Sequence, residues 1–217
     1  MITIIDYGIG NLRSIEKAFE TVGATVHRTD DPDEVATAER LVLPGVGAFR
    51  ACIDEIRQRD LEAPIHDAID RGTPFLGVCV GMQLLFETGY EKGKHQGLGV
   101  LPGYVAHFRE TEADMPDDLS VPHMGWNAIE PTRDSPLLDG LGDAPYVYFV
   151  HSYHPVAKNP DDVLATTTYG HEFPSVVHRG NVYGVQFHPE KSQSAGLGLL
   201  ENFATLPQSD RQTPTAA

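Results

Sequence analysis

The stretch FLGVCVGMQ, residues 75–83, places a cysteine between two glycines where a buried strand meets a helix. Phe75 to Val78 form a short apolar run that predicts the strand, and Cys79 follows at its end. A nucleophile on such a sharp turn needs small neighbours, because strand and helix approach each other closely there. The layout is that of the Gly-x-Ser-x-Gly turn of serine hydrolases. The stretch therefore predicts an α/β fold with Cys79 as a candidate nucleophile.

The helix predicted after Cys79 supplies free amide groups and a partial positive charge, which favour a thiolate and can hold an oxyanion. The alternative is that Cys79 is a small buried hydrophobe, the usual role of a free cysteine. Cys52 lies midway along an amphipathic helix without a glycine turn and fits that alternative. We therefore expect two free thiols with different roles.

A thiol nucleophile needs a base, and the sequence offers one in Phe187–Lys191, FHPEK. This motif follows a strong strand pattern at 182–186, so His188 would emerge at a strand end with Glu190 close behind. A carboxylate beside a histidine fixes its tautomer and stabilises the ring when it takes the thiol proton. The alternative is an ordinary surface histidine beside a solvated Glu-Lys pair.

Outward from Cys79, the N-terminal half alternates between strand and helix. Strands are expected at 2–5, 24–27 and 40–43, and helices at about 12–22, 48–57 and 60–71, with 82–86 continuing the helix after Cys79. This alternation predicts a three-layer, doubly wound, mixed but mostly parallel sheet with helices on both faces. The nucleophile turn would then lie at the carboxyl edge of the sheet.

From about residue 104 the pattern changes to short alternating runs separated by Gly, Pro, Asn and Asp. These runs predict mainly antiparallel strands at 104–108, 146–150, 164–168, 175–178 and 182–187, with a tight hairpin at 178–182. A final helix is expected at 193–206. We expect one domain over residues 1–206 and a disordered tail at 207–217.

Composition excludes several classes of protein. The chain carries 31 acidic against 16 basic residues, a net charge of −15, so nucleic acid is not an expected partner. No apolar run approaches the roughly 20 residues of a membrane span, and no secretion signal is evident. We expect a cytoplasmic protein that does not enter a membrane.

The motifs at 77–83 and 187–191 together resemble those of the class I (triad) glutamine amidotransferase family, and the resemblance spans residues 1 to about 206. Val80 stands where leucine is frequent, a conservative change. Four further motifs, at 6–12, 44–47, 123–127 and 149–153, are similar to those of glutaminase subunits that serve imidazole glycerol phosphate synthases in histidine biosynthesis.

The resemblance implies that Cys79 attacks the carboxamide of glutamine, that His188 protonates the departing ammonia and later activates water, and that Glu190 orients His188. It implies an oxyanion site made by the amide of Val80 and an amide of the loop at Val46 and Gly47, where flanking glycines permit a peptide to reorient. The substrate contacts that it implies are Gln83, Ser152 and Tyr153. No cofactor and no metal are expected.

Ammonia is useful to a synthase only as the uncharged base, so it has to be passed on directly. The resemblance implies a separate (β/α)8 cyclase/synthase subunit as partner in a heterodimer. The residues that match family positions around the shared face are Asn11, His123, Trp126, Tyr148 and Lys191. Trp126 and Tyr148 could instead be ordinary core residues.

Other interpretations remain open at this point. A triad enzyme could serve a different synthase, such as one that forms anthranilate, GMP, carbamoyl phosphate or pyridoxal phosphate. The chain could also be a non-catalytic relative, or a thiol-dependent α/β-hydrolase, although such hydrolases usually place the acid before the histidine in the sequence. A metal site at His151 and His154 is disfavoured, because strand residues three apart point to opposite faces.

Overall fold

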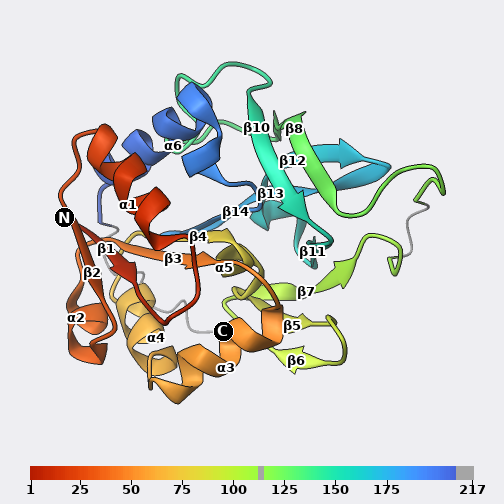
Figure 1. The fold of residues 1–217 in the computed structure, drawn as a ribbon. Helices are drawn as coiled ribbons and strands as arrows, with labels where there is room; N and C mark the ends of the chain where they lie inside the picture. The colour runs from red at the N-terminus through yellow and green to blue at the C-terminus, as the bar shows by residue number, and fades with distance from the viewer. Residues whose placement is uncertain (112–114, 209–217) are drawn as a thin grey trace, which may run out of the picture.

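The computed structural model describes residues 1–111 and 115–208, and these form three β-sheets with helices packed around the largest one (Figure 1). The eight-stranded sheet has the order β2-β1-β3-β4-β14-β13-β12-β9, and smaller sheets have the orders β10-β8 and β11-β7-β5-β6. The part of the predicted tail from residue 209 onward lies outside the described residues.

The elements of the N-terminal half are β1 (Ile2–Ile5), α1 (Leu12–Thr21), β2 (Val26–Thr29), α2 (Pro32–Thr37), β3 (Leu41–Gly45), α3 (Phe49–Gln58), α4 (Glu62–Asp70), β4 (Phe75–Cys79) and α5 (Val80–Gln83). The elements that follow are β5 (Phe86–Gly89), β6 (His95–Gln96), β7 (Leu101–His107), β8 (His123–Ala128), β9 (Glu130–Pro131), β10 (Tyr146–His151), β11 (Tyr153–Ala157), η1 (Pro160–Asp162), β12 (Val163–Tyr169), β13 (His171–Arg179), β14 (Val182–Val185), η2 (Pro189–Lys191) and α6 (Gln193–Thr205).

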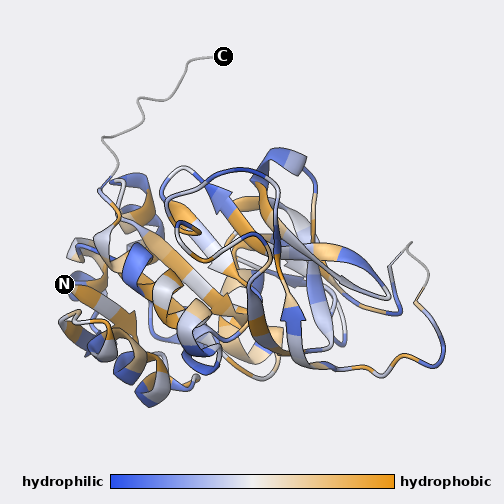
Figure 2. Cartoon of the chain, turned by 90° about the horizontal axis from the view of Figure 1, so that it is seen from above, coloured by the Kyte–Doolittle hydropathy of each residue, from blue (hydrophilic) through white to orange (hydrophobic). Residues whose placement is uncertain are grey.

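The parallel half of the large sheet confirms the predicted α/β architecture. Strands β2, β1, β3, β4 and β14 pair in parallel, and every residue of β1, β3, β4 and β14 is buried. Figure 1 shows α1 and α6 on one face of this sheet and α3 and α4 on the other. Burial on both faces explains why these strands are continuous apolar runs, visible as orange ribbon between the helices in Figure 2.

The second half of the chain is mainly antiparallel, as predicted, but it does not extend a single sheet. Strands β13, β12 and β9 continue the large sheet, whereas β10 pairs only with β8 and β11 pairs with β7. The predicted hairpin is present, since Arg179 faces Val182 across the two-residue connection between β13 and β14. Pairing partners this far apart in sequence leave no local signal, so the separation into three sheets was not predictable.

The prediction that 82–86 continue as helix is wrong. Helix α5 ends at Gln83, and strand β5 begins at Phe86. The carbonyl of Leu84 accepts from the N–H of Leu98 at 2.7 Å, and the carbonyl of Leu85 accepts from the N–H of Leu101 at 2.9 Å. These long-range bonds take the acceptors that further helical turns would use.

The short helix α2 was also not predicted from the sequence. Asp31 caps it, because its Oδ1 accepts from the backbone N–H of Asp33 at 2.9 Å, and Pro32 occupies the first helical position. None of the helices in the described part of the chain combines the length and apolar character needed to cross a lipid bilayer.

Two glycines allow the turn after β4 to lie directly against the sheet. A Cβ atom at Gly81 would stand 1.9 Å from the carbonyl oxygen of Leu43 on β3, and one at Gly77 would stand 2.6 Å from the carbonyl oxygen of Gly81. Both obstacles are backbone atoms that a side-chain rotation cannot move. The need for small residues on both sides of Cys79 thus has the reason predicted from the sequence, which is close approach.

We expect Gly81→Ala to destabilise the fold by at least about 3 kcal/mol, because the added methyl forces β3 and α5 apart. Gly23→Ala is the matched control, since its methyl would meet nothing within 4 Å and only the backbone angle φ of +82° opposes it. That control should cost about 1–2 kcal/mol. Urea unfolding measures both variants, and equal losses would contradict the close-approach argument.

Candidate functional site

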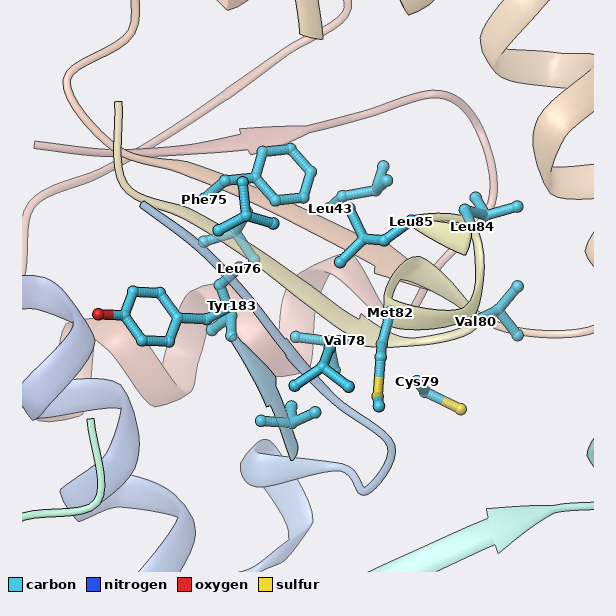
Figure 3. Packing of buried hydrophobic residues seen from close by; sticks show 14 of the residues in the cluster. Leu43, Phe75, Leu76, Val78, Cys79, Val80, Met82, Leu84, Leu85 and Tyr183 are labelled. Atoms are coloured by element: carbon cyan, nitrogen blue, oxygen red, sulfur yellow. The ribbon is translucent and has the colours of Figure 1, made fainter. Parts of the chain in front are cut away.

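Cys79 ends β4 in a backbone conformation that few residues other than glycine adopt, with φ of +55° and ψ of −109°. This conformation turns the chain sharply, so that Cys79 precedes the first turn of α5 (Figure 3). The strain is tolerated because strand and turn are packed tightly on both sides. Figure 3 shows the Cys79 side chain at the strand end, close to Val80 and Met82 of the turn.

His188 and Glu190 lie across from Cys79, just after the end of β14, which is the strand next to β4. The ring Nδ1 of His188 is 2.9 Å from Oε1 of Glu190, and the side chains of both residues are buried, at 6% and 2% exposure. The Cys79 side chain lines the same cavity as the ring and is the other group that raises the pKa of His188. The structure thus brings together the three residues of the predicted triad.

Electrostatics keep His188 charged despite its burial. Burial disfavours the charged ring, but hydrogen bonds and charge interactions with Cys79 and Glu190 outweigh it and raise the pKa of His188 to about 10. The His188 ring is therefore in its charged, imidazolium form at neutral pH. A charged ring can donate a proton at once to a leaving group.

The main chain of His188 is fixed to strand β10. Its N–H donates to the carbonyl of Tyr148 at 2.9 Å, and its carbonyl accepts from the hydroxyl of Ser192 at 2.6 Å. The same Ser192 oxygen accepts from the N–H of Tyr148 at 2.9 Å. The main chain of His188 is therefore linked to Tyr148 both directly and through Ser192.

A cavity of about 250 Å³ opens next to Cys79. Drug-sized ligands occupy pockets of about 300–1,000 Å³, so this volume suits a ligand of the size of an amino acid. The sequence-predicted residues that line it are Val46, Gly47, Cys79, Val80, Gln83, Ser152, Tyr153, His188 and Lys191, and the additional ones are Glu91, Val150 and His151.

The loop at the end of β3 lies beside Cys79, because Gly45 pairs with Cys79 in the parallel register. A Cβ at Gly45 would stand 2.7 Å from the backbone nitrogen of Gly81, so this glycine serves close packing rather than peptide reorientation. Gly47 differs, since its φ is +81° and the space around it is open. The carbonyl of Val46 accepts from the Cys52 thiol at 3.4 Å, and burial raises the pKa of that thiol to about 11.

Gln83 is buried at the wall of the cavity with its amide nitrogen fully engaged. The nitrogen donates to the carbonyl of Tyr153 at 2.9 Å and to Oε1 of Gln186 at 3.2 Å. Both hydrogens are thereby used, and the carbonyl oxygen of Gln83 is the end available to a ligand.

Glu91 is the functional candidate that the sequence did not reveal. It follows β5 in the polar loop 90–94, where a glutamate indicates no more than an exposed turn. In the structure its Oε2 accepts from the N–H of Phe49 at 2.7 Å, which satisfies a free donor at the start of α3 and holds the carboxylate at the cavity. Among the described residues, Glu91 is the only carboxylate that lines this cavity.

An exposed aromatic face adjoins the cavity on the β8–β10 sheet. Trp126 pairs with Tyr148 across the two strands, their ring centroids are 6.1 Å apart, and the ammonium of Lys191 lies 5.7 Å from the centroid of the Tyr148 ring. Met124, Trp126 and Tyr146 are 62%, 45% and 62% exposed. This face, defined by Met124, Trp126, Tyr146, Tyr148 and Lys191, is a contiguous surface of the kind that proteins use for association.

Two other residues predicted at the shared face lie in different settings. Asn11 is exposed at the start of α1, where its side chain makes no capping hydrogen bond. His123 is only 2% exposed and stacks on Tyr169 and Phe149, with ring centroids 4.0 and 4.6 Å away. Burial lowers the pKa of His123 to about 4, so it is a neutral core residue that cannot touch a partner directly.

Histidines are numerous near the site, yet they do not form a metal centre. No group of three or more His, Cys, Asp or Glu side chains within residues 1–111 and 115–208 is arranged to hold a metal ion. His123 and His151 instead share a hydrogen bond of 3.3 Å, and His151 Nδ1 donates to the carbonyl of Tyr153 at 2.9 Å.

The raised pKa of His188 makes a pH-dependent contribution to stability that Glu190→Gln should reveal. The charged ring stabilises the fold fully below its unfolded pKa of 6.5, and this contribution is lost as the pH rises towards 10. We expect the variant to be less stable than wild type by about 2 kcal/mol at pH 6 and by clearly less at pH 9.5. Urea unfolding checks this, with exposed Glu130→Gln as control, and a gap that widens with pH would contradict the assignment.

Comparison with known proteins is consistent with the geometry. Residues 3–206 match the family described as "Glutamine amidotransferase class-I". The chain is 81% identical, over 217 residues and 100% of both chains, to the imidazole glycerol phosphate synthase subunit HisH of Salinibacter ruber. It is 52% identical over 207 residues to the subunit of the same description from Rhodopirellula baltica, covering 95% of this chain and 98% of the relative.

Solved structures agree at the level of the fold. A crystal structure of a glutamine amidotransferase superposes with a TM-score of 0.69 at 19% sequence identity, covering 94% of this chain and 99% of the other. The match of the family to nearly the whole chain and the high identity to its relatives lead to one conclusion. The chain belongs to the class I glutamine amidotransferase family.

Proposed function

We propose that this chain is the glutaminase subunit of an imidazole glycerol phosphate synthase. It hydrolyses glutamine through a cysteine thioester and passes the ammonia to a separate synthase subunit. The observation that carries the proposal is the convergence of Cys79 and His188, with Glu190 bound to the histidine ring, at a cavity of amino-acid size that opens beside an exposed aromatic face.

The reaction begins with attack of the Cys79 sulfur on the carboxamide carbon of glutamine, which gives a tetrahedral adduct. His188, charged at rest, donates its proton to the nitrogen of the adduct, and ammonia leaves as the thioester forms. The neutral ring then takes a proton from water, which attacks the thioester carbon and releases glutamate. Glu190 holds the ring through Nδ1 in both steps.

The oxyanion of the adduct needs donors beside the sulfur. The Val80 amide follows Cys79 directly, and the loop at Val46 and Gly47 lies alongside because β3 pairs with β4. The peptide next to Gly47 can reorient in this loop for two reasons. Glycine adopts the positive φ of this position without strain, and no neighbouring atom lies within 4 Å of where its Cβ would be. Each such donor contributes about 3 kcal/mol to the stabilisation of the transition state.

The walls of the cavity offer groups that match an α-amino acid. The carboxylate of Glu91 suits the α-ammonium group, and the free carbonyl of Gln83 accepts from a donor of the substrate. The chain at Ser152 and Tyr153 closes the opposite wall. Together they select a zwitterionic substrate over a simple amide.

The position of the aromatic face beside the cavity determines where a partner could receive the released ammonia. Lys191 belongs to the cavity and to this face, so a partner seated on the face would cover the exit of the cavity. A (β/α)8 synthase subunit in a heterodimer would then receive ammonia without its protonation in solvent. There it would be used to form imidazole glycerol phosphate and an aminoimidazole carboxamide ribotide.

The function is tested by measuring glutamate release from glutamine, with the chain alone and with a candidate (β/α)8 subunit plus its nucleotide substrate. We expect strong stimulation by the partner, and a loss of at least about 10³-fold in Cys79→Ala because no other group can form the thioester. Cys52→Ala is the matched control and should keep its nucleophile. Activity that is equal in wild type and Cys79→Ala would reject the proposal.

The docking face is tested separately with Trp126→Ala. Loss of a central aromatic anchor should weaken binding of the (β/α)8 subunit by about 2–3 kcal/mol, or roughly 30- to 150-fold in Kd. Tyr90→Ala is the control, because Tyr90 is an aromatic residue of similar exposure, 42%, that does not belong to this face. Titration calorimetry measures the affinity of each variant for the (β/α)8 subunit. Equal affinities of Trp126→Ala and wild type would show that the partner binds a different surface.

A further inference from the structure

Gln186 occupies a position that the mechanism above leaves without a role. It follows β14 directly, two residues before His188, and its side chain is completely buried. Its Nε2 is 3.8 Å from the Cys79 sulfur, and its Oε1 accepts from Gln83 at 3.2 Å. Its backbone N–H donates to the carbonyl of Ser175 at 2.9 Å, which anchors the residue to β13.

The hydrogen bonds themselves determine which end of the Gln186 amide faces the sulfur. The carbonyl of Tyr153 can only accept, so the end of Gln83 that faces it is the NH₂ group. The same nitrogen of Gln83 faces Gln186, where a second NH₂ group would give two donors and no acceptor. Gln186 must therefore present its oxygen to Gln83 and its NH₂ group to Cys79.

We propose that Gln186 is a positioning residue that donates a hydrogen bond to the Cys79 sulfur, and so orients the nucleophile and favours its thiolate form. A donor lowers the free energy of a charged acceptor more than that of a neutral one. The sulfur then has two polar partners, the side chains of His188 and Gln186, which lie two residues apart in the segment that follows β14. This inference deepens the proposed function, because it concerns the nucleophile of the same reaction.

The side chain of Gln186 is held in place by residues that form the wall of the cavity. Gln83 and Tyr153 line the space where the substrate would bind, and they hold Gln186 through a chain of hydrogen bonds that ends on the sulfur. The burial of Gln186 makes its amide costly unless both ends are paired. Among the residues that the structure describes, the Cys79 sulfur is the only acceptor for its NH₂ group.

The test is the pH profile of Cys79 alkylation by iodoacetamide, a small neutral reagent that reacts with the thiolate. Gln186→Met keeps the length of the side chain without a donor, and Gln186→Glu keeps its shape but directs an acceptor at the sulfur. We expect both variants to react about tenfold more slowly at neutral pH and to need a higher pH for half-maximal rate, with the larger effect in Gln186→Glu. Mass spectrometry follows the peptide with Cys79 separately from the one with Cys52.

Gln96→Met and Gln96→Glu are matched controls, because Gln96 is an exposed glutamine on β6 and these changes should leave the profile as in wild type. Profiles of the two Gln186 variants that coincide with wild type would show that Gln186 only fills space. If neither variant folds, the side-chain amide proton resonances of Gln186 are compared between wild type and Cys79→Ala. A resonance that does not move on loss of the sulfur overturns the proposal.

Alkylation requires neither glutamine nor a partner, so its result is independent of the proposed function. An altered profile without glutaminase activity would keep the pairing of Gln186 with Cys79 and reject the proposed glutaminase function. Partner-stimulated glutaminase activity with an unaltered alkylation profile would keep the proposed function and reject the pairing of Gln186 with Cys79.

Discussion

The turn after β4 lies against the neighbouring strand β3 with no room for a side chain at Gly81, and this contact organises the site. It holds Cys79 in its strained conformation, with φ of +55°, and places Val80 beside the loop that ends β3. Because β14 pairs with β4 on the other side, the segment with His188 ends at the same edge of the sheet. The carboxyl ends of three adjacent parallel strands thus supply the proposed nucleophile, its proposed base and the loop proposed to hold the oxyanion.

Buried histidines near the site have pKa values shifted in opposite directions. His123 and His154 are buried among aromatic rings, and burial lowers the pKa of each to about 4. His188 is also buried, yet its pKa is raised to about 10 because its interactions with Cys79 and Glu190 favour the charged ring. Burial disfavours the charge on all three rings, and the partners of His188 outweigh it, so His188, unlike His123 and His154, is charged at neutral pH.

Catalytic and docking elements share a backbone connection. Strand β10 carries Tyr148 on the aromatic face, and its main chain holds the segment of His188 by hydrogen bonds in both directions. A partner that shifts β10 would therefore shift the base relative to the sulfur. This arrangement gives a physical reason why the proposed synthase subunit could alter the activity of the site without contributing a residue to it.

The sequence by itself determined the parallel half of the fold, the turn at Cys79 and the three residues of the proposed triad. These features depend on local sequence patterns, because apolar runs, glycine spacing and the order of a few neighbouring residues are enough to specify them. Only the tertiary structure decided the position of Glu91 at the cavity, the contact of Gln186 with the Cys79 sulfur, the burial of His123, the end of α5 at Gln83 and the division into three sheets. Each of these depends on a hydrogen bond or a packing contact between residues far apart in the chain, for which a local sequence pattern carries no information.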